Sequence, residues 1–300
     1  MTRRTWLLFV AMSLIWGVPY LLISEAVAEV SPAVVVFART AIGTVVLLPF
    51  AWRQLRVVWE HRWPVLAFAL LEMVGPWFLL SDAERHLSSS LAGLLIAFAP
   101  VLALVIARVI GLERRIGGLR IVGLVLAVGG VAALGGGGMQ ASGAWPVIEM
   151  LLVAVGYAIA PQVAAAKLGG VPPLPMTAVC LTIAALLSAP FAIITWPSAM
   201  PSATAAGSLV LLGLLCTALA FLLFFRLIAE AGPARATAIA YVNPVVALAL
   251  GVSLRGDPFT PLIGVGALLV LAGTFLATRR NEPSAAGARQ GTEAEGAPTP

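Results

Sequence analysis

Ten long apolar stretches divide this sequence, and they constrain its fold more than any other feature. Each is close to the roughly 20 residues that a helix needs to cross the hydrocarbon core of a bilayer. Apolar residues run on without the polar alternation of a membrane β-barrel strand. The sequence therefore predicts an all-α integral membrane protein with ten transmembrane helices, at residues 5–24, 33–52, 64–81, 89–110, 118–138, 145–166, 175–196, 206–225, 234–254 and 260–278.

Composition excludes a soluble domain with the same helices. Hydrophobic residues make up 61% of the chain and charged residues only 10%, whereas soluble proteins carry about 25% charged residues. So few charges cannot cover a surface that faces water.

The basic residues orient the ten helices. With the N-terminus in the cytoplasm, fifteen of the 18 lysines and arginines fall in cytoplasmic segments, Arg85 and Arg255 fall outside, and Arg39 lies within a span. Cytoplasmic loops of membrane proteins collect Lys and Arg in this way. We expect a multi-pass protein of the cytoplasmic (inner) membrane with both termini inside. The net charge of +5 then reflects topology and gives no reason to expect nucleic acid as a partner.

The two halves of the chain are related by an internal repeat. Residues 88–104 (SSSLAGLLIAFAPVLAL) align with 232–248 (GPARATAIAYVNPVVAL) at an offset of 144, which places Pro100 on Pro244. In the next helix of each half, a pair of glycines recurs with the same seven-residue spacing at an offset of 143, namely Gly123 and Gly130 with Gly266 and Gly273. We expect one five-helix repeat at 1–138, a second at 139–280, and a disordered cytoplasmic tail at 281–300 that is rich in Glu, Ser, Gly and Pro. Because five is odd, the second repeat is inverted, as in many secondary transporters.

Several short motifs in these helices resemble the drug/metabolite transporter superfamily, and specifically its EamA-type members. The motifs are Trp16-Gly17, Phe37-Ala38-Arg39, Ser89-Ser90-Leu91-Ala92 through Pro100-Val101, Glu113-Arg114-Arg115 before the helix with Gly123 and Gly130, and Gly232-Pro233-Ala234-Arg235-Ala236 through Asn243-Pro244-Val245. The resemblance covers roughly residues 5–280. The chain departs from the family pattern at Asp257-Pro258-Phe259, which we expect to affect only the register between helices 9 and 10.

This resemblance implies a transporter that moves small metabolites, often amino acids, without ATP, and more often outward than inward. It also implies a central cavity between the repeats, lined mainly by helices 1, 3, 4, 6, 8 and 9. The substrate, the direction of transport and the coupling ion do not follow from it. Small-molecule substrate and lipid are the expected partners, and a homo-oligomer is compatible with the architecture.

Signatures of other activities are missing from the sequence. The sole lysine, Lys167, is followed by Leu-Gly, so the GxxxxGK[ST] loop of a nucleotide pump is absent. His61 and His86 lie in loops on opposite sides, and Cys180 and Cys216 lie in apolar runs. The chain also lacks the HExxH and GxSxG motifs. We expect no cofactor, no metal site and no catalytic residues, although an embedded enzyme and a non-transporting membrane subunit remain the alternative interpretations.

Two charged residues at membrane depth are the first candidates for the substrate site. A charge at the centre of a membrane helix costs at least about 2.5–3.5 kcal/mol on insertion scales, which makes a functional role the first hypothesis. Arg39 lies in the second span and Glu72 near the middle of the third. For Arg39, a role in the cavity and a role in helix packing both remain open. Arg39 and Glu72 are expected to be neighbours, and Glu72 is the candidate for proton coupling.

The remaining candidates are prolines, aromatic residues and amides within the spans. Pro100 and Pro244 each leave a backbone carbonyl without its helical N–H donor, and two such kinks at equivalent places point to a substrate site. The sequence adds five aromatic residues and two amides as possible cavity residues, of which we expect some to pack instead: Trp16, Tyr20, Trp77, Tyr157, Tyr241, Gln162 and Asn243.

Overall fold

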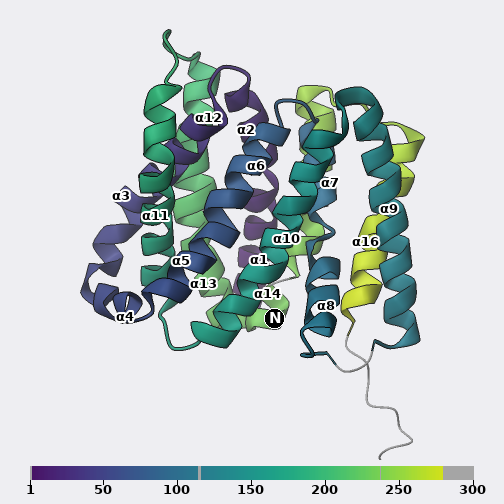
Figure 1. Ribbon diagram of the computed structural model, residues 1–300, viewed down its shortest axis with the longest axis horizontal. Coiled ribbons are helices and arrows are strands. Elements are labelled where there is room, and N and C mark those ends of the chain that lie inside the picture. The colour runs from purple at the N-terminus through teal and green to yellow at the C-terminus, as the bar shows by residue number, and fades with distance from the viewer. Residues whose placement is uncertain (1, 114–115, 237, 280–300) are drawn as a thin grey trace, which may run out of the picture.

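The computed structural model describes residues 2–113, 116–236 and 238–279, and all the secondary structure in these ranges is helical (Figure 1). The expected tail at 281–300 lies outside the described residues. Within them, nine helices are long and apolar enough to cross a bilayer, and Ile239–Arg255 forms a shorter apolar helix. The chain is therefore a ten-helix membrane protein, as the apolar pattern predicts.

Six of the ten spans are built from more than one helical piece. The first half contains α1 (Arg3–Gly17) with α2 (Pro19–Val27), α3 (Pro32–Ala51) continued by α4 (Leu55–Glu60), α5 (Arg62–Ala69) with α6 (Gly75–Ala83), α7 (Ser89–Ile96) with α8 (Ala99–Val109), and α9 (Gly118–Ser142). The second half contains α10 (Ala144–Lys167), α11 (Pro173–Ile194), α12 (Ala203–Gly213) with α13 (Ala220–Ala231), α14 (Pro233–Ala236) with α15 (Ile239–Leu250), and α16 (Pro261–Thr278).

The breaks between these pieces have local causes. Pro19 stands at the start of α2, and Pro100 stands in the first turn of α8 after the chain turns at Ala97 and Phe98. Proline tolerates the first turn of a helix because its missing N–H is unpaired there in any case. The joins at Leu70–Val74 and Leu214–Leu219 are π-helical instead. Such widened turns occur frequently at functional sites.

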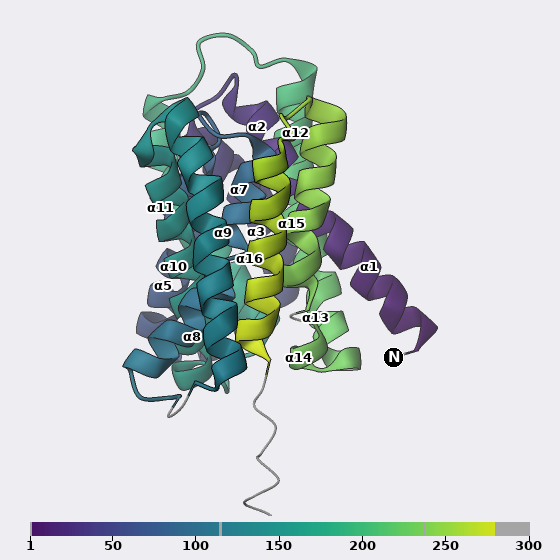
Figure 2. The ribbon, with the colours of Figure 1, turned by 90° about the vertical axis from the view of Figure 1, so that its right-hand side faces the viewer.

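The helices pack in pairs that correspond between the two halves. α3 packs on α11, α9 on α16, and α7 on α15, so that the second, fifth and fourth spans each contact their own counterpart. The contact of α10 with α6 likewise corresponds to that of α2 with α12. Figure 2 shows α9 and α16 side by side along the bundle, with the start of α1 and the end of α16 at the same end. We call the opposite end of the bundle the far end.

Glycines allow the close approach of α9 and α16, as the paired spacing suggests. A Cβ atom added to Gly123 would lie 2.4 Å from the Ala277 backbone nitrogen, and one added to Gly273 would lie 2.4 Å from that of Ala127. The obstructing atoms belong to the backbone, so they cannot rotate away. Small residues at these positions therefore set the distance between the two helices.

Candidate functional site

Two of the π-helical segments, Leu70–Val74 and Leu214–Leu219, occupy equivalent places in the two halves. The repeat offset of 144 carries position 70 onto 214, and it carries Glu72-Met73 onto Cys216-Thr217. Glu72 therefore lies in one widened turn and Thr217 in the other.

Arg39 on α3 lies against the second of these segments and is buried, with 4% of its surface exposed. Its guanidinium carbon is 3.7 Å from the centre of the Trp77 ring on α6, a cation–π contact that is strongest when water is excluded. Its Nη2 donates to Thr217 Oγ1 at 3.3 Å, whereas its Nε has no hydrogen-bond partner. Arg39 is thus held in place by Trp77 and Thr217 but keeps an unused donor.

Two tyrosines complete the surroundings of this arginine. Tyr20 from α2 and Tyr157 from α10 lie close to Arg39 and to each other, and Trp77 lies close to Tyr157. Tyr20 and Trp77 are buried. We call Tyr20, Arg39, Trp77, Tyr157 and Thr217 the arginine cluster. Elements from both halves contribute to it.

Arg39 and Glu72, which the sequence predicts to be neighbours, do not form an ion pair with each other. Instead, Trp77 covers the guanidinium and Thr217 accepts its hydrogen bond. Glu72 lies beside Tyr157, and its Oε2 is buried without a hydrogen-bond partner. A tyrosine hydroxyl is therefore the group that lies near both charges.

Thr217 is a contact of Arg39 that the sequence reasoning missed. Its hydroxyl donates to the Leu212 carbonyl at 2.8 Å and accepts from Arg39. A threonine in an apolar span gives no signal by itself. The repeat offset, which aligns Thr217 with the residue after Glu72, was the available indication.

Three of the predicted site residues have structural contacts elsewhere. Trp16 packs against Phe221 edge to face and against Phe224 at a tilt, with ring centres at 5.8 and 4.7 Å. The Tyr241 hydroxyl is 2.5 Å from Thr278 Oγ1. The Asn243 amide nitrogen, in the orientation that gives it acceptors, donates to the Ser13 carbonyl at 3.2 Å and to the Ile239 carbonyl at 2.9 Å.

Pro100, Pro244 and Gln162, which the sequence suggests as cavity residues, also have local structural surroundings of their own. Ahead of Pro100 the helix stops at Ile96 and resumes at Ala99, and the free Ala97 carbonyl accepts the Thr274 hydroxyl at 3.0 Å. That acceptor is used by α16. Pro244 lies buried inside α15. Gln162 donates to the carbonyl of Ala158 in its own helix, and its Oε1 is buried without a partner.

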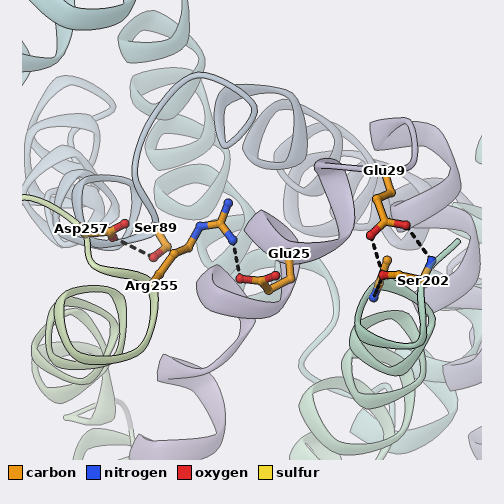
Figure 3. A network of polar contacts seen from close by, with 7 residues as sticks. Glu25, Glu29, Ser89, Ser202, Arg255 and Asp257 are labelled. Atoms are coloured by element: carbon orange, nitrogen blue, oxygen red, sulfur yellow. Dashed lines mark hydrogen bonds and ion pairs between the residues drawn. The ribbon is translucent and has the colours of Figure 1, made fainter.

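Polar contacts join the two halves of the chain at the far end of the bundle (Figure 3). Arg255 forms an ion pair with Glu25. Glu29 accepts from the Ser202 backbone N–H at 2.6 Å and from its hydroxyl at 2.5 Å, and these bonds hold the pKa of Glu29 below its ordinary range. We call Glu25, Glu29, Ser89, Ser90, Ser202, Arg255 and Asp257 the far-end latch. Each of its pairs joins the first half of the chain to the second.

Asp257 forms the most extensive contact of the latch, which corrects the expectation that its loop affects only register. Its Oδ2 accepts from the Ser89 hydroxyl at 2.9 Å, the Ser90 backbone N–H at 2.9 Å and the Ser90 hydroxyl at 2.7 Å. Ser89 and Ser90 form the first turn of α7, where a carboxylate satisfies free N–H groups and interacts favourably with the helix dipole. The loop thus fastens α7 to the second half.

A surface hollow of about 490 Å³ lies apart from both groups, between α3, α12 and the connection that precedes α12. None of the predicted site residues lines it. Its lining is mainly apolar and consists of Ala38, Ile42, Trp196, Pro197, Ser198, Ala199, Met200, Pro201, Ala206, Leu209 and Val210.

Known transporters are similar to this chain over most of its length. "Uncharacterized inner membrane transporter YedA" of Escherichia coli K12 is 25% identical, covering 89% of this chain and 90% of its own. An "Uncharacterized transporter" of Archaeoglobus fulgidus is 23% identical over 92% of this chain and 99% of its own. A "Probable terminal-alkyne amino-acid exporter" of Streptantibioticus cattleyicolor is 32% identical over 67% and 68% of the two chains.

The fold is also found in a solved crystal structure, which covers 93% of this chain and 97% of its own with a TM-score of 0.64 at 22% identity. The model of the EamA-like transporter family matches residues 3–136 and again residues 144–279. Two matches to one family model, end to end over the ten-helix bundle, account for nearly the whole sequence. The chain is a multi-pass membrane protein that belongs to the EamA-like transporter family.

Proposed function

We propose that this protein is a secondary transporter that exports small metabolites with a carboxylate group, such as amino acids, by alternating access. The arginine cluster is the observation that carries this proposal. A buried guanidinium with an unpartnered Nε is suited to a carboxylate, because its fork of N–H donors matches the two carboxylate oxygens. Trp77 and Thr217 hold the guanidinium in place before substrate arrives.

An amino acid also carries a positive ammonium group, for which the site offers acceptors. The unpartnered Glu72 Oε2 and the neighbouring Tyr157 hydroxyl suit that group. A relative is named as a probable amino-acid exporter, which favours this substrate class and the outward direction. Glu72 remains our candidate for the group that couples transport to a proton gradient.

The proposed cycle requires two halves that move against each other. We propose repeats at 1–138 and 139–280, in inverted orientation, that rock about the arginine cluster and expose it to each side in turn. We also propose that both termini lie in the cytoplasm and that the protein resides in the inner membrane. The far end would then face outward, so the latch of cross-half contacts would be an outer gate.

Two other functions would predict different behaviour. An embedded enzyme would convert its ligand chemically, and a non-transporting subunit would not carry solute across a sealed membrane. Purified protein in vesicles distinguishes the three, because only a transporter moves an unchanged solute across the bilayer.

The test begins with a thermal-shift screen of amino acids and related carboxylates, since a ligand that binds the folded state raises the melting temperature. The compounds that shift it are then assayed for transport in vesicles. Arg39→Leu should abolish transport and the ligand-induced shift, whereas Arg39→Lys should restore only part of each because it lacks the fork. Arg56→Leu is the matched control, since the Arg56 side chain is 91% exposed. Full transport by Arg39→Leu would refute the proposed role of this arginine.

A further inference from the structure

Glu84 is a buried carboxyl that the proposed transport site does not use. It follows α6 directly, in the turn that leads to α7, outside the membrane-spanning segments. Only 4% of its surface is exposed, and neither Oε1 nor Oε2 has a hydrogen-bond partner. An ionised carboxylate in such a place is costly, whereas a protonated one is much less so. The position therefore favours the neutral acid.

The charged groups around Glu84 come from several elements. Asp257 and Arg255 belong to the latch and Arg39 to the arginine cluster, and all three charges act on Glu84. Tyr20 from α2 lies near both Glu84 and Arg39. From α10, Glu149 faces Asp82. Burial and the charge of Asp257 raise the pKa of Glu84 well above its ordinary value, and the two arginines and the nearby Ser24 backbone oppose this.

These arginines are already engaged with other groups. Arg255 pairs with Glu25, while Arg39 lies against Trp77 and bonds to Thr217. Glu84 thus has a negative neighbour in Asp257 and no cation that is bonded to it.

A metal ion is not the ligand that this arrangement favours. Among the described residues, no group of three or more His, Cys, Asp or Glu side chains is arranged to hold one. A proton needs only a single carboxyl oxygen, and it removes the charge that burial disfavours.

We propose that Glu84 is a proton-binding site that controls the far-end latch, so that protonation favours the closed latch and loss of the proton favours opening. The proposal rests on the transporter function proposed above for its biological meaning, but the latch itself can be tested without a substrate. Opening exposes Glu84 to water, where its carboxylate is stable. The proton is bound and released at Glu84, so no other reactant is needed.

The sign of the pH effect follows from linkage. The closed latch binds the proton more tightly than the open latch, because Glu84 is buried only when the latch is closed. Lower pH therefore favours closure, and closure is lost as the pH rises from the ordinary range of a glutamate toward the raised pKa of the closed state.

The test measures the distance across the latch by pulsed electron paramagnetic resonance. Spin labels at Ala28→Cys and Phe259→Cys report on the two halves, since both residues are exposed, in a protein whose Cys180 and Cys216 are replaced by alanine. In vesicles, a long-distance population should grow as the pH rises from about 5 to about 9, the range over which a buried carboxyl loses its proton. Glu84→Gln should keep the short distance throughout, and Glu84→Met should do the same if an unpaired amide impairs folding.

His86→Gln is the matched control, because His86 is a second titratable residue in the same turn. This variant should respond to pH as the parent protein does. A pH response that survives in both Glu84 variants, or that is lost in His86→Gln, would overturn the proposal, as would a parent protein with no response. A normal latch response in a protein that transports none of the solutes would refute the proposed function alone.

Discussion

The far-end latch depends on a glycine that faces it, and Gly251→Ala is the sharpest test of the closed arrangement. A Cβ atom at position 251 would lie 2.2 Å from Ser90 Oγ, 2.3 Å from Asp257 Oδ2 and 2.8 Å from Ser89 Oγ. Favourable contacts of carbon with other heavy atoms begin at roughly 3.5 Å. A methyl group at position 251 would therefore occupy the space in which Asp257 contacts the first turn of α7.

The magnitude follows from the bonds that the methyl group displaces. Asp257 accepts three hydrogen bonds from Ser89 and Ser90, and a hydrogen bond to a charged group is worth about 1.5–3 kcal/mol. Water can form hydrogen bonds to Asp257 in place of some of these, since Asp257 is only half-buried, and this reduces the loss. Alanine also stabilises a helix by about 1 kcal/mol relative to glycine. We expect a net weakening of the latch by about 2 kcal/mol, which is about a 30-fold fall in the ratio of closed to open protein.

The spin-label pair at positions 28 and 259 measures this ratio directly. Gly251→Ala should show the long-distance population even at a pH at which the parent protein is closed. Gly207→Ala is the control, because nothing lies within 4 Å of a Cβ atom added there. If Gly251→Ala keeps the short distance at every pH, the Asp257 contact does not hold the halves together.

Three further predictions concern packing, topology and coupling. Gly123→Ala should destabilise the protein by about 1–3 kcal/mol through overpacking, measured by unfolding in detergent, whereas Gly129→Ala, which faces open space on the same helix, should be neutral or stabilising. In a background without Cys180 and Cys216, a cysteine at Met200 should react with an impermeant reagent from outside and one at Gly169 should not; labelling of both from one side contradicts the ten-helix topology. Glu72→Gln should exchange substrate between vesicle compartments but fail to accumulate it when a pH gradient is imposed, and continued accumulation would exclude Glu72 as the coupling group.

The sequence predicted the ten spans because bilayer thickness acts on each helix separately. Apolar length is a local property, so all ten spans follow from it, including the one whose helix, Ile239–Arg255, is shorter than the others. The π-helical turns at Leu70–Val74 and Leu214–Leu219 were not predicted. No residue type marks a widened turn, because it depends on how neighbouring helices pack against it.

The site was predicted only in part because its contacts join distant parts of the chain. Depth in the membrane suggested Arg39 and Glu72 as candidates, but an apolar sequence pattern could not show that Trp77 would lie next to the guanidinium. The latch was missed for a related reason. Glu25 and Arg255 are separated by 230 positions, and each looks like an ordinary loop charge until the two halves are placed together.

The proposed sign of the latch also bears on the direction of transport. Bacterial cells keep the outer face of the inner membrane more acidic than the cytoplasm, so an open latch that faces outward meets the higher proton concentration. Protonation of Glu84 there would close the latch after substrate has left and return the empty site to the cytoplasm. Before the loaded protein opens outward again, Glu84 would have to lose this proton, through the side of the arginine cluster that then faces the more alkaline cytoplasm. An importer would need the opposite order, with closure of the outer gate tied to substrate arrival. A carboxyl that closes the outer gate when protonated therefore fits an exporter driven by the proton gradient.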